Sequence, residues 1–159
     1  MKNLVKSFGY AFNGIFTALV KERNMRIHIT CCIYMFFFLF AFDFFEITRT
    51  QVAILFLACG LVIGSELINT AVEAAVDLHG EEHTKLGKIA KDCAAGAVLV
   101  FAIFAVLCGI AIMYQPKAFK ALFAYFLANP VAIVLFAISV VIFTIFIFKG
   151  IPFKSKENK

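Results

Sequence analysis

Long apolar segments alternate with short polar ones along the chain, and this pattern predicts membrane-spanning helices. The apolar segments cover roughly residues 27–42, 51–77, 93–113 and 131–148. A helix needs about 20 apolar residues to cross about 30 Å of hydrocarbon, and the strict alternation of a membrane strand is absent from these segments. The sequence therefore predicts an all-α integral membrane protein with four spans.

Composition agrees with that prediction and excludes a small soluble domain. The 159 residues are 63% hydrophobic and include 21 Phe, and the mean hydropathy is +0.95. A soluble core of this size cannot bury so much apolar surface. The excess is accounted for if most of the helices face lipid.

The N-terminal stretch, residues 2–21, separates apolar and polar residues onto two faces of one helix. Leu4, Phe8 and Phe12 share one face, and Lys6 and Tyr10 lie on the other. A helix of this kind lies in the interface, with lysines toward the headgroups and aromatic rings toward the acyl chains. We expect an interfacial amphipathic helix before the first span.

Acidic residues on the second span form the most informative feature of the sequence. At about 100° per residue, Glu66, Glu73 and Asp77 fall within about 40° of one another, and Asn69 lies close to the same face. Acids on one stripe repel unless a cation lies among them or some remain protonated. Either this helix is leaving the bilayer with its polar face turned to water, or the stripe is a cation-dependent site at the membrane surface.

The distribution of charge predicts which side of the membrane the stripe faces. The net charge is +5, and most basic residues fall in segments 1–28, 78–92 and 149–159, whereas the opposite loops carry Arg49, Lys117 and Lys120. The positive-inside rule places both termini and the acidic stripe in the cytoplasm, where ATP and Mg²⁺ are found. In a membrane protein this charge sets topology, so we expect no nucleic-acid partner.

The polar residues between the spans divide the chain into two parts. Residues 78–90 predict a cytoplasmic connection with room for one short helix, and Lys91 and Asp92 then precede the third span as a helix cap and interface marker or as functional groups. Residues 1–113 form the expected core. The remainder, 114–159, predicts an interfacial segment, a fourth span and a basic cytoplasmic tail.

Phosphoryl transfer is one chemistry that the polar residues could perform, although no glycine-rich phosphate loop is present in the sequence. That reaction needs Mg²⁺ across phosphate oxygens, a cation for developing charge, and a base for the attacking hydroxyl. Glu22 and Glu73 offer oxygen ligands, Lys91 a cation, and Glu66 a base. Taken alone, Glu22 fits a solvated ion-pair cluster with Arg26 and the other basic residues around it better than it fits a metal ligand. The three histidines lack zinc-ligand spacing, and we expect solvated or interfacial side chains.

Three sequence blocks resemble the small prokaryotic diacylglycerol kinase family. They are GYAFNGIFTALVKERNMRIH from Gly9 to His28, E-x-x-N-T-A-x-E-x-x-V-D from Glu66 to Asp77, and A-K-D-x-A-A-G-A-V from Ala90 to Val98. This version is more similar to the Gram-positive branch, whose members are undecaprenol kinases. Asn3 departs from the arginine of some relatives, and the fourth span lies outside the three-span pattern.

The resemblance implies a fold and a set of roles. It implies an interfacial helix and three spans in a homotrimer that shares active sites between protomers, with Glu66 as the general base and Glu22 and Glu73 as Mg²⁺ ligands. Asn69 matches a position of the lipid-substrate site. The implied ATP contacts are Tyr10, Asp77, Lys91 and Asp92, with Glu82, His83 and Thr84 from the connection.

The function that follows is transfer of the γ-phosphate of Mg-ATP to undecaprenol, which gives undecaprenyl phosphate. Diacylglycerol, giving phosphatidic acid, is the close alternative, because both acceptors present a primary hydroxyl at the interface. A cation or proton transporter and a non-catalytic membrane protein are alternatives of other classes. A transporter predicts polar residues across the whole bilayer, whereas the external half of the second span is apolar.

Overall fold

The computed structural model describes residues 2–78 and 84–151 of the chain. Its helices are α1 (Lys2–Lys21), α2 (Arg23–Ala41), α3 (Arg49–Asp77), α4 (Lys85–Met113), α5 (Pro116–Ala128) and α6 (Pro130–Lys149). Four of them, α2, α3, α4 and α6, are long and apolar enough to cross a membrane. The predicted all-α membrane fold is therefore confirmed.

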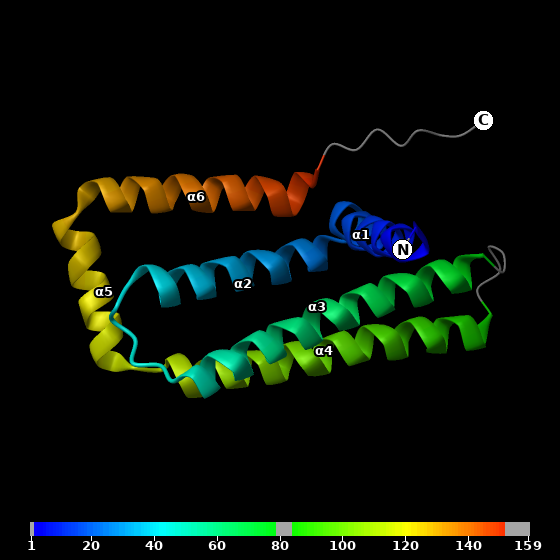
Figure 1. The fold of residues 1–159 in the computed structure, drawn as a ribbon, viewed down its shortest axis with the longest axis horizontal. Coiled ribbons are helices and arrows are strands. Elements are labelled where there is room, and N and C mark those ends of the chain that lie inside the picture. Colours follow the sequence, from blue (N-terminus) through cyan, green and yellow to red (C-terminus); the bar gives the residue numbers. More distant parts are fainter. Residues whose placement is uncertain (1, 79–83, 152–159) are drawn as a thin grey trace.

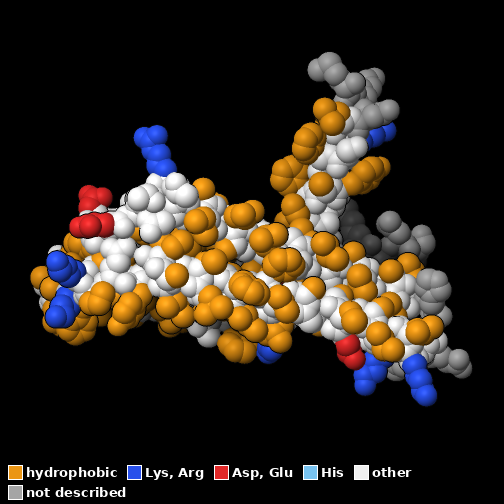
Figure 2. Space-filling model, turned by 90° about the horizontal axis from the view of Figure 1, so that it is seen from below, with side chains coloured by type: hydrophobic (Ala, Val, Ile, Leu, Met, Phe, Trp, Pro, Cys, Tyr) orange, Lys and Arg blue, Asp and Glu red, His pale blue; other side chains and the backbone are white. Residues whose placement is uncertain are grey.

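The four long helices lie side by side, and the two others run across them (Figure 1). α1 crosses the bundle where α2 begins and α3 ends, and we call this the α1 end. α5 crosses at the opposite end, which we call the α5 end. In Figure 2, α1 stands out from the body of the molecule as a separate arm. A helix set across the spans is the arrangement expected for the interfacial segment.

Packing between the helices is uneven. α3 and α4 form the most extensive pair, and α2 lies between α3 and α6. The buried cluster is small and consists of Leu39, Leu55 and Ile112 from three helices. Figure 2 shows hydrophobic side chains over most of the body, with charged groups mainly toward the two ends. This distribution is typical of helices whose outer faces contact lipid.

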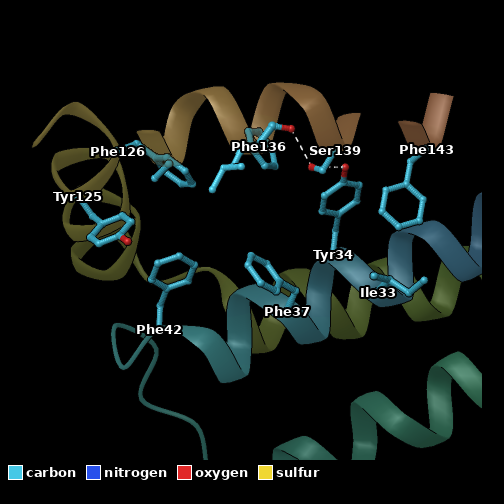
Figure 3. Close-up of a pocket in the computed structure, with 11 residues that line it drawn as sticks. Ile33, Tyr34, Phe37, Phe42, Tyr125, Phe126, Phe136, Ser139 and Phe143 are labelled. Atoms are coloured by element: carbon cyan, nitrogen blue, oxygen red, sulfur yellow. Dashed lines mark hydrogen bonds between the residues drawn. The ribbon is translucent and has the colours of Figure 1, made fainter. Parts of the chain in front are cut away.

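α6 attaches to the face of α2 that points away from α3. Tyr34 and Ser139 are joined through their hydroxyls at 3.0 Å, and Ser139 also donates to the Phe136 carbonyl. Rings from α2, α5 and α6 surround a cavity of about 320 Å³ beside this contact, as Figure 3 shows. Edge-to-face contacts of Tyr34 with Phe136 and Phe143 add to the attachment.

Two predicted helix boundaries are wrong. The first span begins at Arg23 rather than Ile27, and α4 begins at Lys85, so residues 85–92 form its first two turns instead of a connection. A helix satisfies its own backbone hydrogen bonds, so it continues past the point where apolar residues end. Thr84 caps α4 by accepting a hydrogen bond from the Gly87 amide.

Candidate functional site

Glu66 is the most deeply buried carboxylate of the predicted stripe. It lies on α3 toward the α1 end, and only 1% of the residue is exposed. His28 of α2 places Nε2 3.3 Å from Glu66 Oε1, but no group in the described residues donates a well-directed hydrogen bond to that oxygen. A buried carboxylate oxygen without a donor is costly, so it marks a place where a hydroxyl can donate.

Asn69 lies one turn beyond Glu66 and holds the next carboxylate. Its Nδ2 donates to Glu73 Oε1 at 2.9 Å, which orients that side chain. Asn69 is 7% exposed, and its Oδ1 also has no hydrogen-bond partner in the part of the chain that the structure describes. The face of α3 therefore presents two unpartnered oxygens and one oriented carboxylate. The predicted stripe is continuous, and it becomes more exposed from Glu66 to Asp77.

Glu22 occupies the corner between α1 and α2. Its backbone is extended, with φ −94° and ψ 117°, and it occupies the N-cap position of α2 without a side-chain capping hydrogen bond. Partial burial and the nearby carboxylate of Glu73 raise the pKa of Glu22, while Lys21 and Arg26 act in the opposite direction. This mutual electrostatic influence indicates that Glu22, at the junction of α1 and α2, lies near Glu73 and Glu66 on α3. The structure therefore brings Glu22 near two carboxylates of α3 that are distant from it in the chain.

The donor set fits Mg²⁺ rather than a transition metal. Glu22 and Glu73 are hard oxygen donors that repel each other, and the orphaned Asn69 Oδ1 adds a neutral oxygen nearby. Among the described residues, no three His, Cys, Asp or Glu side chains form a metal-holding group. Mg²⁺ commonly takes one or two protein carboxylates and completes its shell with phosphate oxygens and water, so two carboxylates suffice.

Asp77 and Lys91 join the ends of α3 and α4. Lys91 Nζ donates to Asp77 Oδ1 across the two helices, and the Asp77 side chain remains 65% exposed. Because α4 starts at Lys85, Lys91 and Asp92 lie inside a helix rather than at its cap. This position excludes the predicted role of the pair as a helix cap. The ammonium group therefore sits beside the acidic stripe, where it can meet a phosphate.

The other predicted ATP contacts are spread around this end of the molecule. Tyr10 on α1 and Asp92 on α4 are exposed, and neither contacts the carboxylates. Glu82 and His83 lie outside the described residues. Thr84 is engaged as the cap of α4. Tyr10 and Asp92 could therefore act on ATP only by contacting the nucleotide directly, because neither side chain contacts the carboxylates of its own chain within the part that the structure describes.

Sequence reasoning missed two residues of α2. We expected a solvated or interfacial His28, but it contacts buried Glu66. Arg26, expected in a solvated ion-pair cluster, is 6% exposed and donates to backbone carbonyls instead. Their position in the sequence could have indicated these roles. Both polar residues are continuous with an apolar span, and polar groups within a span usually have a function.

Residues 9–113 match the family described as prokaryotic diacylglycerol kinase. A diacylglycerol kinase from Synechocystis sp. is 43% identical over 115 residues, which is 72% of this chain and 64% of that protein. An undecaprenol kinase from Bacillus subtilis is 38% identical over 119 residues, 74% of this chain and 92% of that protein. A diacylglycerol kinase from Escherichia coli is 32% identical over 104 residues, 65% of this chain and 83% of that protein.

The chain therefore belongs to the prokaryotic diacylglycerol kinase family, a family of ATP-dependent lipid kinases. The resemblance stated from the three sequence blocks is confirmed. The match ends at Met113, so α5 and α6 lie beyond it. Family membership favours the lipid-kinase hypothesis over the transporter and non-catalytic hypotheses. It leaves the acceptor lipid open, because relatives of both names match.

Proposed function

We propose that this protein transfers the γ-phosphate of Mg-ATP to the hydroxyl of undecaprenol, forming undecaprenyl phosphate and ADP. The observation that carries this proposal is the buried Glu66 Oε1, which lacks a hydrogen-bond donor at the head of a series of polar side chains. Undecaprenol is favoured as the acceptor because the alignment with the Bacillus subtilis undecaprenol kinase spans 92% of that protein. The second candidate is diacylglycerol, favoured by the 43% identity to the Synechocystis protein.

Glu66 acts as the general base in this mechanism. A lipid hydroxyl arrives from the bilayer, donates to Glu66 Oε1 and loses its proton to that carboxylate as its oxygen attacks the γ-phosphorus. The bond from the γ-phosphorus to the bridging oxygen breaks, and ADP leaves with that oxygen. His28, 3.3 Å from the same carboxylate, keeps the side chain in place. Asn69 orients Glu73 and can accept a hydrogen bond from the substrate through Oδ1.

Glu22 and Glu73 would hold the Mg²⁺ ion. The chemistry supplied by such an ion would be electrostatic stabilisation of the charge that develops on the transferred phosphoryl group. Burial and the repulsion from Glu73 raise the pKa of Glu22, and a cation held by both carboxylates would relieve that repulsion. Lys91 meets the phosphates, with Asp77 holding its ammonium group at the site. Tyr10 and Asp92, together with Glu82 and His83, complete the ATP contacts.

The assembly follows the family resemblance. We infer a homotrimer in the cytoplasmic membrane, with both termini cytoplasmic and each site shared between neighbouring protomers. Tyr10 is exposed on α1, so its side chain is accessible to a neighbour's nucleotide. Residues 1–113 are the kinase core, and residues 114–159 are an extension attached to α2.

The proposal is tested by transfer of labelled γ-phosphate to undecaprenol and to diacylglycerol, side by side in mixed micelles. Label mainly in undecaprenyl phosphate supports the proposal. Label mainly in phosphatidic acid keeps the mechanism and replaces the acceptor. Folded protein that labels neither lipid contradicts the proposed activity.

A further inference from the structure

Arg26 connects three helix ends at the corner where Glu22 lies. From the first turn of α2, its Nη1 donates to the carbonyls of Leu19 at 3.1 Å and Val20 at 2.7 Å in the last turn of α1. Its Nε donates to the carbonyl of Ile147 at 3.1 Å in the last turn of α6. The carbonyls in the last turn of a helix lack partners within that helix, so one guanidinium satisfies groups from both ends.

Electrostatics favour the same arrangement. The C-terminal end of a helix carries a partial negative charge, and α1 and α6 both direct that end toward the cation on Arg26. Burial makes the interaction stronger than it would be in water, because the residue is only 6% exposed. The donors of the guanidinium are spread over three nitrogens in a rigid plane, so Nε and Nη1 reach different helix ends, whereas a lysine carries all its donors on one nitrogen.

Gly150 allows α6 to approach this closely. It follows the last residue of α6 and has a φ of +67°, a conformation that L side chains rarely adopt. A Cβ at this position would lie 3.3 Å from both Cζ and Nη1 of Arg26. Three hydrogen bonds hold the guanidinium, so it cannot give way freely. The end of α6 is therefore built to fit Arg26.

The position of Glu22 depends on this contact. Glu22 is the single residue between α1 and α2, so its carboxylate is aimed by the angle at which the two helices meet. Arg26 fixes that angle by tying the end of α1 to the start of α2. It also lies close enough to counter the raised pKa of Glu22.

We propose that Arg26 is a positioning residue that holds Glu22 near Glu73 by joining the ends of α1 and α2. In this proposal α6, which lies beyond the part of the chain that matches the family, stabilises the same junction through its contact with Arg26. The fourth span is then a working part of the kinase rather than a separate anchor. This inference rests on the proposed function, because it concerns the cation site assigned to Glu22 and Glu73. Its structural half, that α6 holds the end of α1 through Arg26, does not depend on catalysis.

The test uses the full-length protein with Gly150→Ala, which disturbs the α6 end of the contact without changing a charged group. Two quantities are measured: the Mg²⁺ concentration for half-maximal phosphate transfer, and hydrogen exchange of the amides in the last turn of α1 without ATP or Mg²⁺. We expect the half-maximal Mg²⁺ concentration to rise by about tenfold, the lower end of the effect of losing an outer-shell partner. Exchange in α1 should become faster.

Ser139→Ala is the matched control, because it removes the other polar contact between α6 and α2 while leaving the Arg26 end intact. It should change neither quantity. Arg26→Lys, which keeps the charge but cannot bridge the two helix ends, should reproduce both effects of Gly150→Ala. It also provides the test if Gly150→Ala does not fold.

The outcomes separate this inference from the proposed function. Wild-type Mg²⁺ dependence and wild-type exchange in both Gly150→Ala and Arg26→Lys would overturn the inference. Equal effects of Ser139→Ala and Gly150→Ala would also overturn it, because general loosening of α6 would then be the cause. An unchanged Mg²⁺ dependence in Glu22→Gln would remove the ligand assignment instead, and the exchange measurement would still decide the structural half.

Discussion

Asn69 Nδ2 donates a 2.9 Å hydrogen bond to Glu73 Oε1, and the Oδ1 of the same amide remains buried without a partner. One side chain thus orients a proposed Mg²⁺ ligand and offers a further acceptor. The two functions lie one helical turn from the proposed base, Glu66. The arrangement makes Asn69 a sensitive position for testing the site.

Asn69→Ala should raise the Mg²⁺ concentration needed for half-maximal activity and have a smaller effect on the stability of the protein. A hydrogen bond to a charged group contributes about 1.5 to 3 kcal/mol, so we expect a rise of roughly tenfold or more in the half-maximal Mg²⁺ concentration. Initial rates over a Mg²⁺ series measure the change. Asn129→Ala, which removes an exposed amide at the α5 end, is the control and should leave the curve unchanged. An unchanged curve for Asn69→Ala would show that Glu73 is not held for a metal.

Lys91→Ala and Asp77→Ala should separate phosphate binding from helix pairing. Each substitution breaks the same ion pair, whose contribution to stability is about 0 to 1 kcal/mol because Asp77 is exposed and Lys91 is partly exposed. The two variants should therefore melt within a few degrees of each other. The KM for ATP should rise by roughly tenfold or more in Lys91→Ala, which loses the proposed phosphate contact, and by less in Asp77→Ala, which loses only the group that holds that ammonium. Equal KM values in the two variants would make Lys91 a structural residue.

Glu22→Gln should make the metal-free protein more stable at neutral pH. Because the folded-state pKa of Glu22 is raised, the folded protein binds its proton more tightly than the unfolded chain does. The ionised group therefore destabilises the fold above that pKa, and this effect disappears as the pH falls through it. Apparent unfolding temperatures without Mg²⁺ should differ most at neutral pH and converge in acid. A difference that grows on acidification would contradict the assigned direction.

Phe136→Ala tests the attachment of α6 to α2. The ring contacts Tyr34, Phe38 and Phe126, and it lines the cavity between α2, α5 and α6. Removing a packed aromatic ring costs up to about 3 to 5 kcal/mol in a closed core, and less here because the residue is 37% exposed. We expect a lower unfolding temperature by circular dichroism, with wild-type Mg²⁺ dependence well below it. Phe123→Ala, at an exposed ring on α5, is the control, and an equal loss in both variants would argue against docking at Phe136.

Residues at short sequence separation were the predictable part of this site. The helical period places Glu66, Asn69, Glu73 and Asp77 on one face whatever surrounds the helix, so the stripe was found from the sequence. The all-α membrane fold followed from the length of the apolar runs for the same local reason. The start of α4 was missed, because the end of an apolar run marks the edge of the hydrocarbon and not the end of a helix.

Contacts between distant residues could not be found in this way. The Arg26 guanidinium donates to Ile147, 121 positions away, and no periodicity relates the two residues. His28 contacts Glu66 only because of how α2 and α3 are placed relative to each other along their axes. The resemblance to the family supplied Glu22 as a ligand, whereas the residues alone favoured a solvated ion-pair cluster. These contacts depend on tertiary packing, which the local pattern does not encode.

The central claim is that the buried carboxylate of Glu66 is the base for phosphate transfer to a lipid hydroxyl. Glu66→Gln keeps the shape of the side chain and removes the proton acceptor, and Glu46→Gln makes the same change at an exposed residue of the α5 end. The direct measurement is transfer of labelled γ-phosphate to undecaprenol by both variants, after each is shown to insert and assemble as the wild type does. The account predicts that Glu66→Gln loses at least about a hundredfold in rate, the lower range for a general base, while Glu46→Gln is unchanged. Transfer by Glu66→Gln at the wild-type rate would contradict the account.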